Sequence, residues 1–283
     1  MSSVSAQSPS SPGRTTSALD LGRLFPATIF ILIANAVATK VINAFVDQGW
    51  AKALAGGLGL SWAFWLSFAL CVRLALAEPS RAPRPRDLWL CGACLLAAVV
   101  PVSQVAALAC TALALIILLD RTQGVHLKAS AMVLAAISVQ LLWSRLVMLL
   151  FLKPIAELDA FLVSLTTGSA VHGNTVQFVD GTRGGMAILE GCTSVQNASI
   201  ALMLFVAIVR TFRPAPRWSE LYMLAGLFGS IVAINIVRLT LMAQNMAMFE
   251  RLHGDTGWVA INAIITLTAL LWAATSVRRE IFD

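Results

Sequence analysis

Charged residues are scarce in this sequence. Asp, Glu, Lys and Arg together make up 12% of the 283 residues, whereas hydrophobic residues make up 58%, and the mean hydropathy is +0.82. A water-soluble domain cannot be covered with so few charges, because most of its surface would then be apolar. The composition therefore excludes a soluble domain and predicts an integral membrane protein.

Groups that could hold a metal or a cofactor are also few. The chain has three histidines and five cysteines, and the only closely spaced cysteines, Cys91 and Cys94, lie inside an apolar run, where packing is the expected role. We expect no metal and no organic cofactor. The pI of 9.5 comes from basic residues that flank apolar runs, so it does not indicate a nucleic-acid partner.

Long apolar runs are abundant. A helix of about 20 apolar residues crosses the ~30 Å hydrocarbon layer. Such runs occupy residues 25–46, 57–77, 130–151, 192–212, 218–241 and 257–276. The run 88–119 is interrupted by Pro101 and is long enough for two short spans. The sequence thus predicts an all-α bundle of about eight transmembrane helices.

Basic residues orient this bundle. With both termini in the cytoplasm, 13 of the 20 Lys and Arg residues fall on the cytoplasmic side, as the positive-inside rule requires. Residues 1–20 are rich in Ser, Thr and Pro and predict a disordered cytoplasmic tail. Residues 21–283 then form one polytopic domain, which we place in the inner membrane of a prokaryote.

The one long loop expected on the outer face comprises residues 152–191. Ile155, Leu158, Leu162 and Leu165 recur at helical spacing and predict an amphipathic helix in the membrane interface. Further on, the short runs TVQFV and MAIL flank DGTRGG, which predicts a β-hairpin. We expect a small extracytoplasmic cap; a disordered loop is the alternative.

A thiol, a guanidinium and an imidazole are predicted to meet at the outer membrane surface. Cys192 opens the sixth predicted span, Arg238 lies ~30 Å along the next helix, and His253 lies in the link that follows. A helix N-terminus and nearby cations favour the thiolate form of a cysteine. His253, or alternatively His172, would accept the thiol proton while Arg238 stabilises an oxyanion, which is the chemistry of acyl transfer.

Four further residues are candidates for substrate binding or for support of this site: Arg145, Asn235, Glu190 and Asp255. Arg145 is expected in the outer third of its helix, where an arginine needs a partner, so it belongs to the site or to a structural ion pair. Asn235 lies three residues before the predicted essential arginine, on the same helix face. Glu190 and Asp255 would orient His253 or bind a substrate amine, although exposed loop acids need no role.

Three short motifs carry a family resemblance: EGC at 190–192, NIVR at 235–238 and RLHGDTGW at 251–258. In their order and membrane level they resemble the exosortase/archaeosortase family of integral membrane transpeptidases. The resemblance implies a thiol enzyme that cleaves exported, membrane-anchored proteins at a PEP-CTERM-like C-terminal sorting signal and passes the new carboxyl to a lipid, a glycan or water. It also implies that Cys192 is the nucleophile, Arg238 the essential arginine and His253 the third member. Thr193 and Ser194 depart from the family's Ser-Gly pattern, which bears on the subfamily.

Two other functions remain open at this stage. One is a transporter or flippase that binds an anionic substrate through Arg145 and Arg238. The other is a membrane acyltransferase that uses a histidine without a thiol. Neither requires Cys192.

Overall fold

The computed structural model describes residues 21–278 and residue 280, so the predicted tail 1–20 lies outside the described residues. Ten α-helices follow one another in this part of the chain: α1 (Leu21–Ala55), α2 (Trp62–Leu76), α3 (Pro85–Val99), α4 (Ser103–Leu119), α5 (Val125–Ser138), α6 (Ser144–Thr167), α7 (Ser194–Phe212), α8 (Ser219–Met242), α9 (Met246–His253) and α10 (Asp255–Ser276).

Five helical segments in the described part of the chain are long and apolar enough to cross a membrane: Arg23–Ala55, Val125–Thr167, Ser194–Phe212, Ser219–Met242 and Gly257–Ser276. The apolar helices α2 and α4 are shorter. In the run 88–119 the chain forms α3 and α4, and the break at residues 100–102 contains Pro101, which lacks the N–H that would continue a helix. The class of α-helical membrane protein is therefore confirmed.

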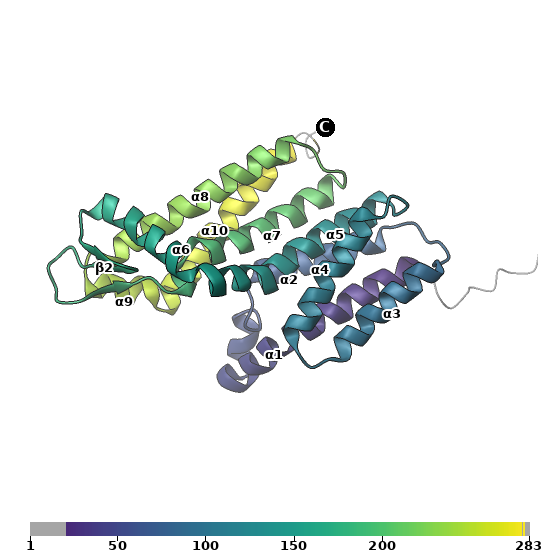
Figure 1. Cartoon of the computed structure of the whole chain (residues 1–283), viewed down its shortest axis with the longest axis horizontal. Coiled ribbons are helices and arrows are strands. Elements are labelled where there is room, and N and C mark those ends of the chain that lie inside the picture. Colours follow the sequence, from purple (N-terminus) through teal and green to yellow (C-terminus); the bar gives the residue numbers. More distant parts are fainter. Residues whose placement is uncertain (1–20, 279, 281–283) are drawn as a thin grey trace, which may run out of the picture.

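The helices lie side by side, with α5 and α7 in the middle (Figure 1). Helix α7 packs against α2, α5, α8 and α10, while α5 packs against α2 and α4, and α1 packs against α3 and α4. At one end of the bundle α9, β2 and the end of α6 are gathered, and the C-terminal end of α10 lies at the other (Figure 1).

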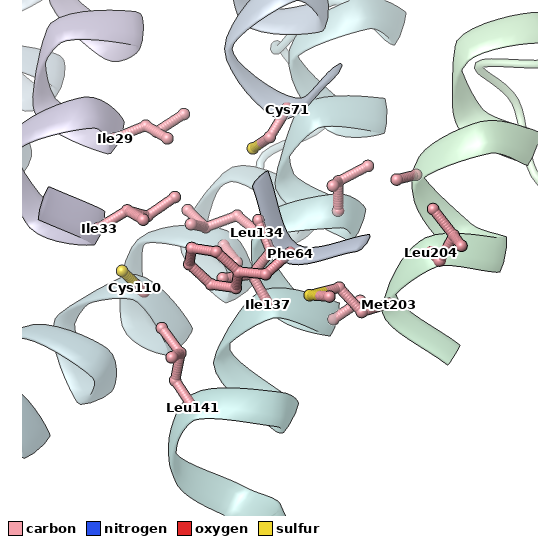
Figure 2. Packing of buried hydrophobic residues seen from close by; sticks show 14 of the residues in the cluster. Ile29, Ile33, Phe64, Cys71, Cys110, Leu134, Ile137, Leu141, Met203 and Leu204 are labelled. Atoms are coloured by element: carbon pink, nitrogen blue, oxygen red, sulfur yellow. The ribbon is translucent and has the colours of Figure 1, made fainter. Parts of the chain in front are cut away.

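The main core is built from apolar side chains of α1, α2, α3, α4, α5, α7, α8 and α10, and Figure 2 shows part of it. Phe64 of α2 lies fully buried among residues of neighbouring helices. Figure 2 labels Ile29, Ile33, Phe64, Cys71, Cys110, Leu134, Ile137, Leu141, Met203 and Leu204. Cys71, Cys91, Cys94 and Cys110 all belong to this core, and the packing role predicted for Cys91 and Cys94 is confirmed.

Helices α5 and α6 are joined without a break by a π-helical turn, Val139–Trp143. Within α6 the backbone departs from helical geometry at Phe151, three residues before Pro154, and the helix then continues to Thr167. A helix is therefore present where the apolar spacing predicted one, but it is the end of α6, and the loop begins after Thr167 instead of at residue 152. Leu158 and Leu165 are exposed.

A small antiparallel sheet follows α6, in the order β1 (Val171–His172), β2 (Thr175–Gln177) and β3 (Gly185–Ala187). The predicted pairing of TVQFV with MAIL is confirmed, since Thr175 pairs with Ala187 and Val176 with Met186. A Cβ at Gly185 would lie 2.6 Å from the Val176 carbonyl oxygen, so the close approach of the strands requires glycine. Val176 and Met186 point into a second apolar cluster, which contains Cys192.

Candidate active site

Cys192 ends a short 3-10 turn, Glu190–Cys192, which leads into α7. The Thr193 hydroxyl donates to the Glu190 carbonyl oxygen at 2.9 Å, and the Cys192 amide donates to the Leu189 carbonyl oxygen at 2.9 Å. These bonds fix the backbone that carries the thiol. Cys192 is only 3% exposed.

The thiol lies beside an imidazole. Cys192 Sγ is 3.9 Å from His253 Nδ1, and His253 is the last residue of α9. The imidazole stacks on the Phe249 ring with 5.0 Å between ring centroids and an interplanar angle of 11°, which fixes the orientation of the ring. His172 is exposed on β1, so the structure favours His253 as the partner of the thiol.

Arg238 reaches the same place from α8. Nη2 of its guanidinium donates to the Leu252 carbonyl oxygen at 3.2 Å, next to His253 in the chain. Arg238 is 7% exposed, and within residues 21–278 and 280 its buried Nε has no hydrogen-bond acceptor. The structure therefore brings the three predicted groups together and leaves one N–H of the arginine available.

Asn235 holds the backbone of the cysteine. Its side chain is fully buried, and Nδ2 donates to the Cys192 carbonyl oxygen at 2.8 Å and to Ser194 Oγ at 3.2 Å. Oδ1 accepts a hydrogen bond from Asn197 Nδ2 at 3.1 Å. Asn235 therefore bonds directly to the main chain of Cys192. The sequence predicted only that it shares a helix face with Arg238.

Asp159 is a site residue that the sequence analysis missed. Its carboxylate accepts hydrogen bonds from the Ser194 amide and the Ser194 hydroxyl, both at 3.2 Å, so it caps the first turn of α7 from a neighbouring helix. Asp159 is 4% exposed and shares its helix face with Ala156, Ala160 and Val163, which are fully buried. An acid at helical spacing among small apolar residues was the available signal.

Among the described residues, the side chains of Arg145 and Glu190 form no hydrogen bond or ion pair with Cys192, Arg238 or His253. Both line a polar cavity of about 290 Å³, together with Asn197 and Trp258. The role of Glu190 in orienting His253 stays a prediction. Asp255 is the first residue of α10, but its side chain lies outside the described residues.

Two features lie near the thiol. Helix α9 has no residue that is fully buried, but its partly buried Phe249 and Leu252 pack against the apolar cluster that contains Cys192. An apolar cavity of about 460 Å³ lies between the π-helical turn, α7 and α8. It is lined by Val195, only three residues after Cys192, and extends along α7 to Leu202.

The part of the chain that the structure describes contains no group of three or more His, Cys, Asp or Glu side chains placed to hold a metal ion. No protein-family model, no curated protein and no solved structure matches this chain. The fold and the site together define an α-helical membrane protein in which a cysteine thiol lies 3.9 Å from a histidine and a buried arginine bonds to the residue before that histidine.

Proposed function

We propose that this chain is a membrane-embedded thiol transpeptidase, which cleaves a membrane-anchored protein through a thioester on Cys192. The observation that carries the proposal is the 3.9 Å approach of Cys192 Sγ to His253 Nδ1, with Arg238 at the same point of the bundle. The pair joins residues 61 positions apart in the chain. A reactive thiol requires such a base and a nearby cation, whereas a packing cysteine requires neither.

In the proposed reaction, His253 accepts the thiol proton and Cys192 Sγ attacks the carbonyl carbon of the scissile peptide bond. The C–N bond then breaks, and His253 returns the proton to the leaving amine. A hydroxyl, an amine or water afterwards attacks the thioester and releases the thiolate. The unpaired Nε–H of Arg238 is the donor best suited to the oxyanion that forms in both steps.

The low exposure of Cys192 requires one conformational step. We propose that the substrate enters beneath α9, which has no fully buried residue and would have to withdraw Phe249 and Leu252 from the cluster that contains Cys192. The apolar cavity beside Val195 would accommodate part of the substrate's own membrane helix. Tethering in the membrane raises the effective concentration of the scissile bond at the thiol.

The proposal includes the placement in the membrane. Eight spans would be formed by α1, α2, α3, α4, α5 with α6, α7, α8 and α10. The sheet, α9 and the site would then lie as a cap on the outer face, with both termini in the cytoplasm of a prokaryote. Basic residues concentrated in the loops at the other end support this orientation. The substrate class, a PEP-CTERM-like sorting signal, rests on the motif resemblance.

The test is the Cys192→Ala variant, compared with Cys94→Ala, which removes a thiol from the main core. We expect the first variant to leave the precursor of the membrane-anchored substrate uncleaved in the host cell, and the second to process it. Mass spectrometry of the wild-type protein should detect a hydroxylamine-sensitive acyl group on Cys192. Normal processing by Cys192→Ala would overturn the proposal and favour a transporter, or an acyltransferase that needs no thiol.

A further inference from the structure

The carboxylate of Asp159 is buried, and the reaction proposed above does not use it. Among the described residues no cation forms an ion pair with it. A buried carboxylate without a counter-ion is costly, because it has lost the water that would solvate its charge. An uncharged side chain such as serine or asparagine can cap the first turn of a helix without this cost. The presence of a carboxylate at this position therefore requires a reason besides the capping of α7.

The carboxylate is one end of a hydrogen-bond network that reaches the nucleophile. Ser194 donates to Asp159 through its amide and through its hydroxyl, both at 3.2 Å. The Ser194 hydroxyl oxygen in turn accepts a hydrogen bond from Asn235 Nδ2 at 3.2 Å. The same nitrogen donates to the Cys192 carbonyl oxygen at 2.8 Å. Side chains of α6, α7 and α8 are thus joined in one network at the main chain of Cys192.

The partners in this network leave one arrangement of its hydrogens. A carboxylate has no hydrogen to donate, so the Ser194 hydroxyl donates to Asp159 and accepts from Asn235. Asn235 must therefore turn its NH2 group toward Ser194. The same NH2 group faces the Cys192 carbonyl oxygen, which can only accept. On the other side of the amide, Asn235 Oδ1 accepts from Asn197 Nδ2 at 3.1 Å.

We propose that Asp159 is a positioning residue for the nucleophile and that it acts by setting the orientation of the Asn235 amide. This inference rests on the proposed function, in which Cys192 attacks the substrate. With its NH2 group toward Cys192, Asn235 holds the main chain that carries the thiol, and the sulfur stays 3.9 Å from His253 Nδ1. Asp159 acts only through Ser194 and Asn235.

The substitution Asp159→Asn removes this control and keeps the shape of the side chain. The new amide oxygen must pair with the Ser194 amide, which can only donate, so the new NH2 group faces the Ser194 hydroxyl. The hydroxyl oxygen then meets a donor on both sides, and its own hydrogen has no acceptor in the network. Asn235 relieves this conflict by turning its oxygen toward Ser194. That turn also places the oxygen against the Cys192 carbonyl, and the bond to the main chain is lost.

The first experiment observes the Cys192 carbonyl by NMR without any substrate. In protein labelled with 13C at the cysteine carbonyls and 15N at threonine, only Cys110–Thr111 and Cys192–Thr193 give a carbonyl–amide correlation, because threonine follows no other cysteine. A hydrogen bond to a carbonyl oxygen moves its 13C signal downfield. We expect Asp159→Asn to move the Cys192 signal upfield, to its position in Asn235→Ala. The Cys110 signal should stay in place and serves as the internal reference.

Removal of the Ser194 hydroxyl distinguishes this role from simple capping or from an effect of charge. In Ser194→Ala, Asn235 Nδ2 keeps the Cys192 carbonyl oxygen as its acceptor, so the Cys192 signal should stay near its wild-type position. In Asp159→Asn/Ser194→Ala the misdirected hydroxyl is absent, and the signal should return to its position in Ser194→Ala.

Two results of this experiment would overturn the positioning role. One is an unchanged Cys192 signal in Asp159→Asn. The other is a double variant whose Cys192 signal lies at its position in Asn235→Ala, because the orientation would then not depend on the Ser194 hydroxyl. The comparison of Ser194→Ala with the double variant remains decisive even if Asp159→Asn alone does not fold.

The second experiment measures the rate of thioester formation on Cys192. The rate should fall about 100-fold in Asp159→Asn, as for a displacement of about 1 Å at a nucleophile. It should fall only about fivefold in Ser194→Ala and in the double variant, which lose one hydrogen bond to Asn235. The matched control is Asp180→Asn, which changes an exposed acid that also accepts a backbone amide, that of Thr182 at 2.9 Å, and should react at the wild-type rate.

The two experiments separate this inference from the proposed function. If the wild type forms no thioester, the proposed function fails, and the carbonyl signals still decide whether Asp159 orients Asn235. If the thioester forms and Asp159→Asn forms it as fast as the wild type, the positioning role fails and the proposed function stands.

Discussion

Replacement of Asn235 by alanine should weaken the fold and the site together. The side chain is fully buried and takes part in three hydrogen bonds, with the Cys192 carbonyl oxygen, Ser194 Oγ and Asn197 Nδ2. Alanine leaves the carbonyl oxygen and the Asn197 amide without these partners. The thiol then loses the contact that fixes its main chain to α8.

The size of the effect follows from these contacts. A buried hydrogen bond contributes about 0.6 kcal/mol between membrane helices and up to about 1.5 kcal/mol in soluble proteins. Three of them give a loss of about 2–4 kcal/mol in the free energy of unfolding, or about 30-fold or more in the unfolding equilibrium. A shift of about 1 Å at the nucleophile would slow acylation about 100-fold.

Both quantities can be measured on one set of variants. Unfolding is followed by titration with denaturing detergent in mixed micelles, and acylation by the rate of thioester formation on Cys192. Asn35→Ala is the matched control, because the Asn35 amide donates a single exposed hydrogen bond to the Val100 carbonyl oxygen. If Asn235→Ala were as stable and as active as Asn35→Ala, the network around the cysteine would have no role in holding it.

Two further predictions concern the stability of the bundle, one at a helix contact and one at a buried ion pair. In Gly226→Ala the new Cβ would lie 2.3 Å from the Trp272 ring, whereas nothing lies within 4 Å of a Cβ at Gly229. The same titration should show that Gly226→Ala lowers the free energy of unfolding by about 1–3 kcal/mol and that Gly229→Ala does not change it. Equal free energies of unfolding for the two variants would mean that α8 and α10 are not closely packed. Glu220→Ala leaves its buried partner Arg210 without a counter-ion and should lower the free energy of unfolding by about 3–5 kcal/mol. A decrease below about 1 kcal/mol would show that water replaces the carboxylate.

The height of a residue along a helix could be predicted from the sequence, but its direction around the helix could not. A rise of 1.5 Å per residue was enough to place Arg238 at the level of Cys192, and Arg238 does bond to the residue before His253, the partner of the thiol. The same arithmetic placed Arg145 in the outer third, yet its side chain lines a different cavity. Rotation about the axis depends on how neighbouring helices pack, and an apolar run carries little information about it.

Asp159 illustrates the same limit. Its burial was readable from the small residues that share its face, but its partner, Ser194, lies 35 residues away in the chain. The contact exists because α6 extends beyond the predicted span and α7 begins beside it. Local sequence patterns predict helices and strands well. Whether two distant residues meet depends on the length and direction of every segment between them, which local patterns do not give.

The π-helical turn between α5 and α6 sets that geometry by chain length. In this turn the Ser144 amide bonds to the Val139 carbonyl oxygen, five residues back instead of four, so the helix accommodates one extra residue. If the same residues were wound as an ordinary α-helix, the extra residue would rotate everything beyond the turn by about 100°. Asp159 would then face away from Ser194, although every side chain of the site was still present. The one extra residue of the π-helical turn therefore decides which side of α6 faces Cys192, although it takes no part in any chemistry.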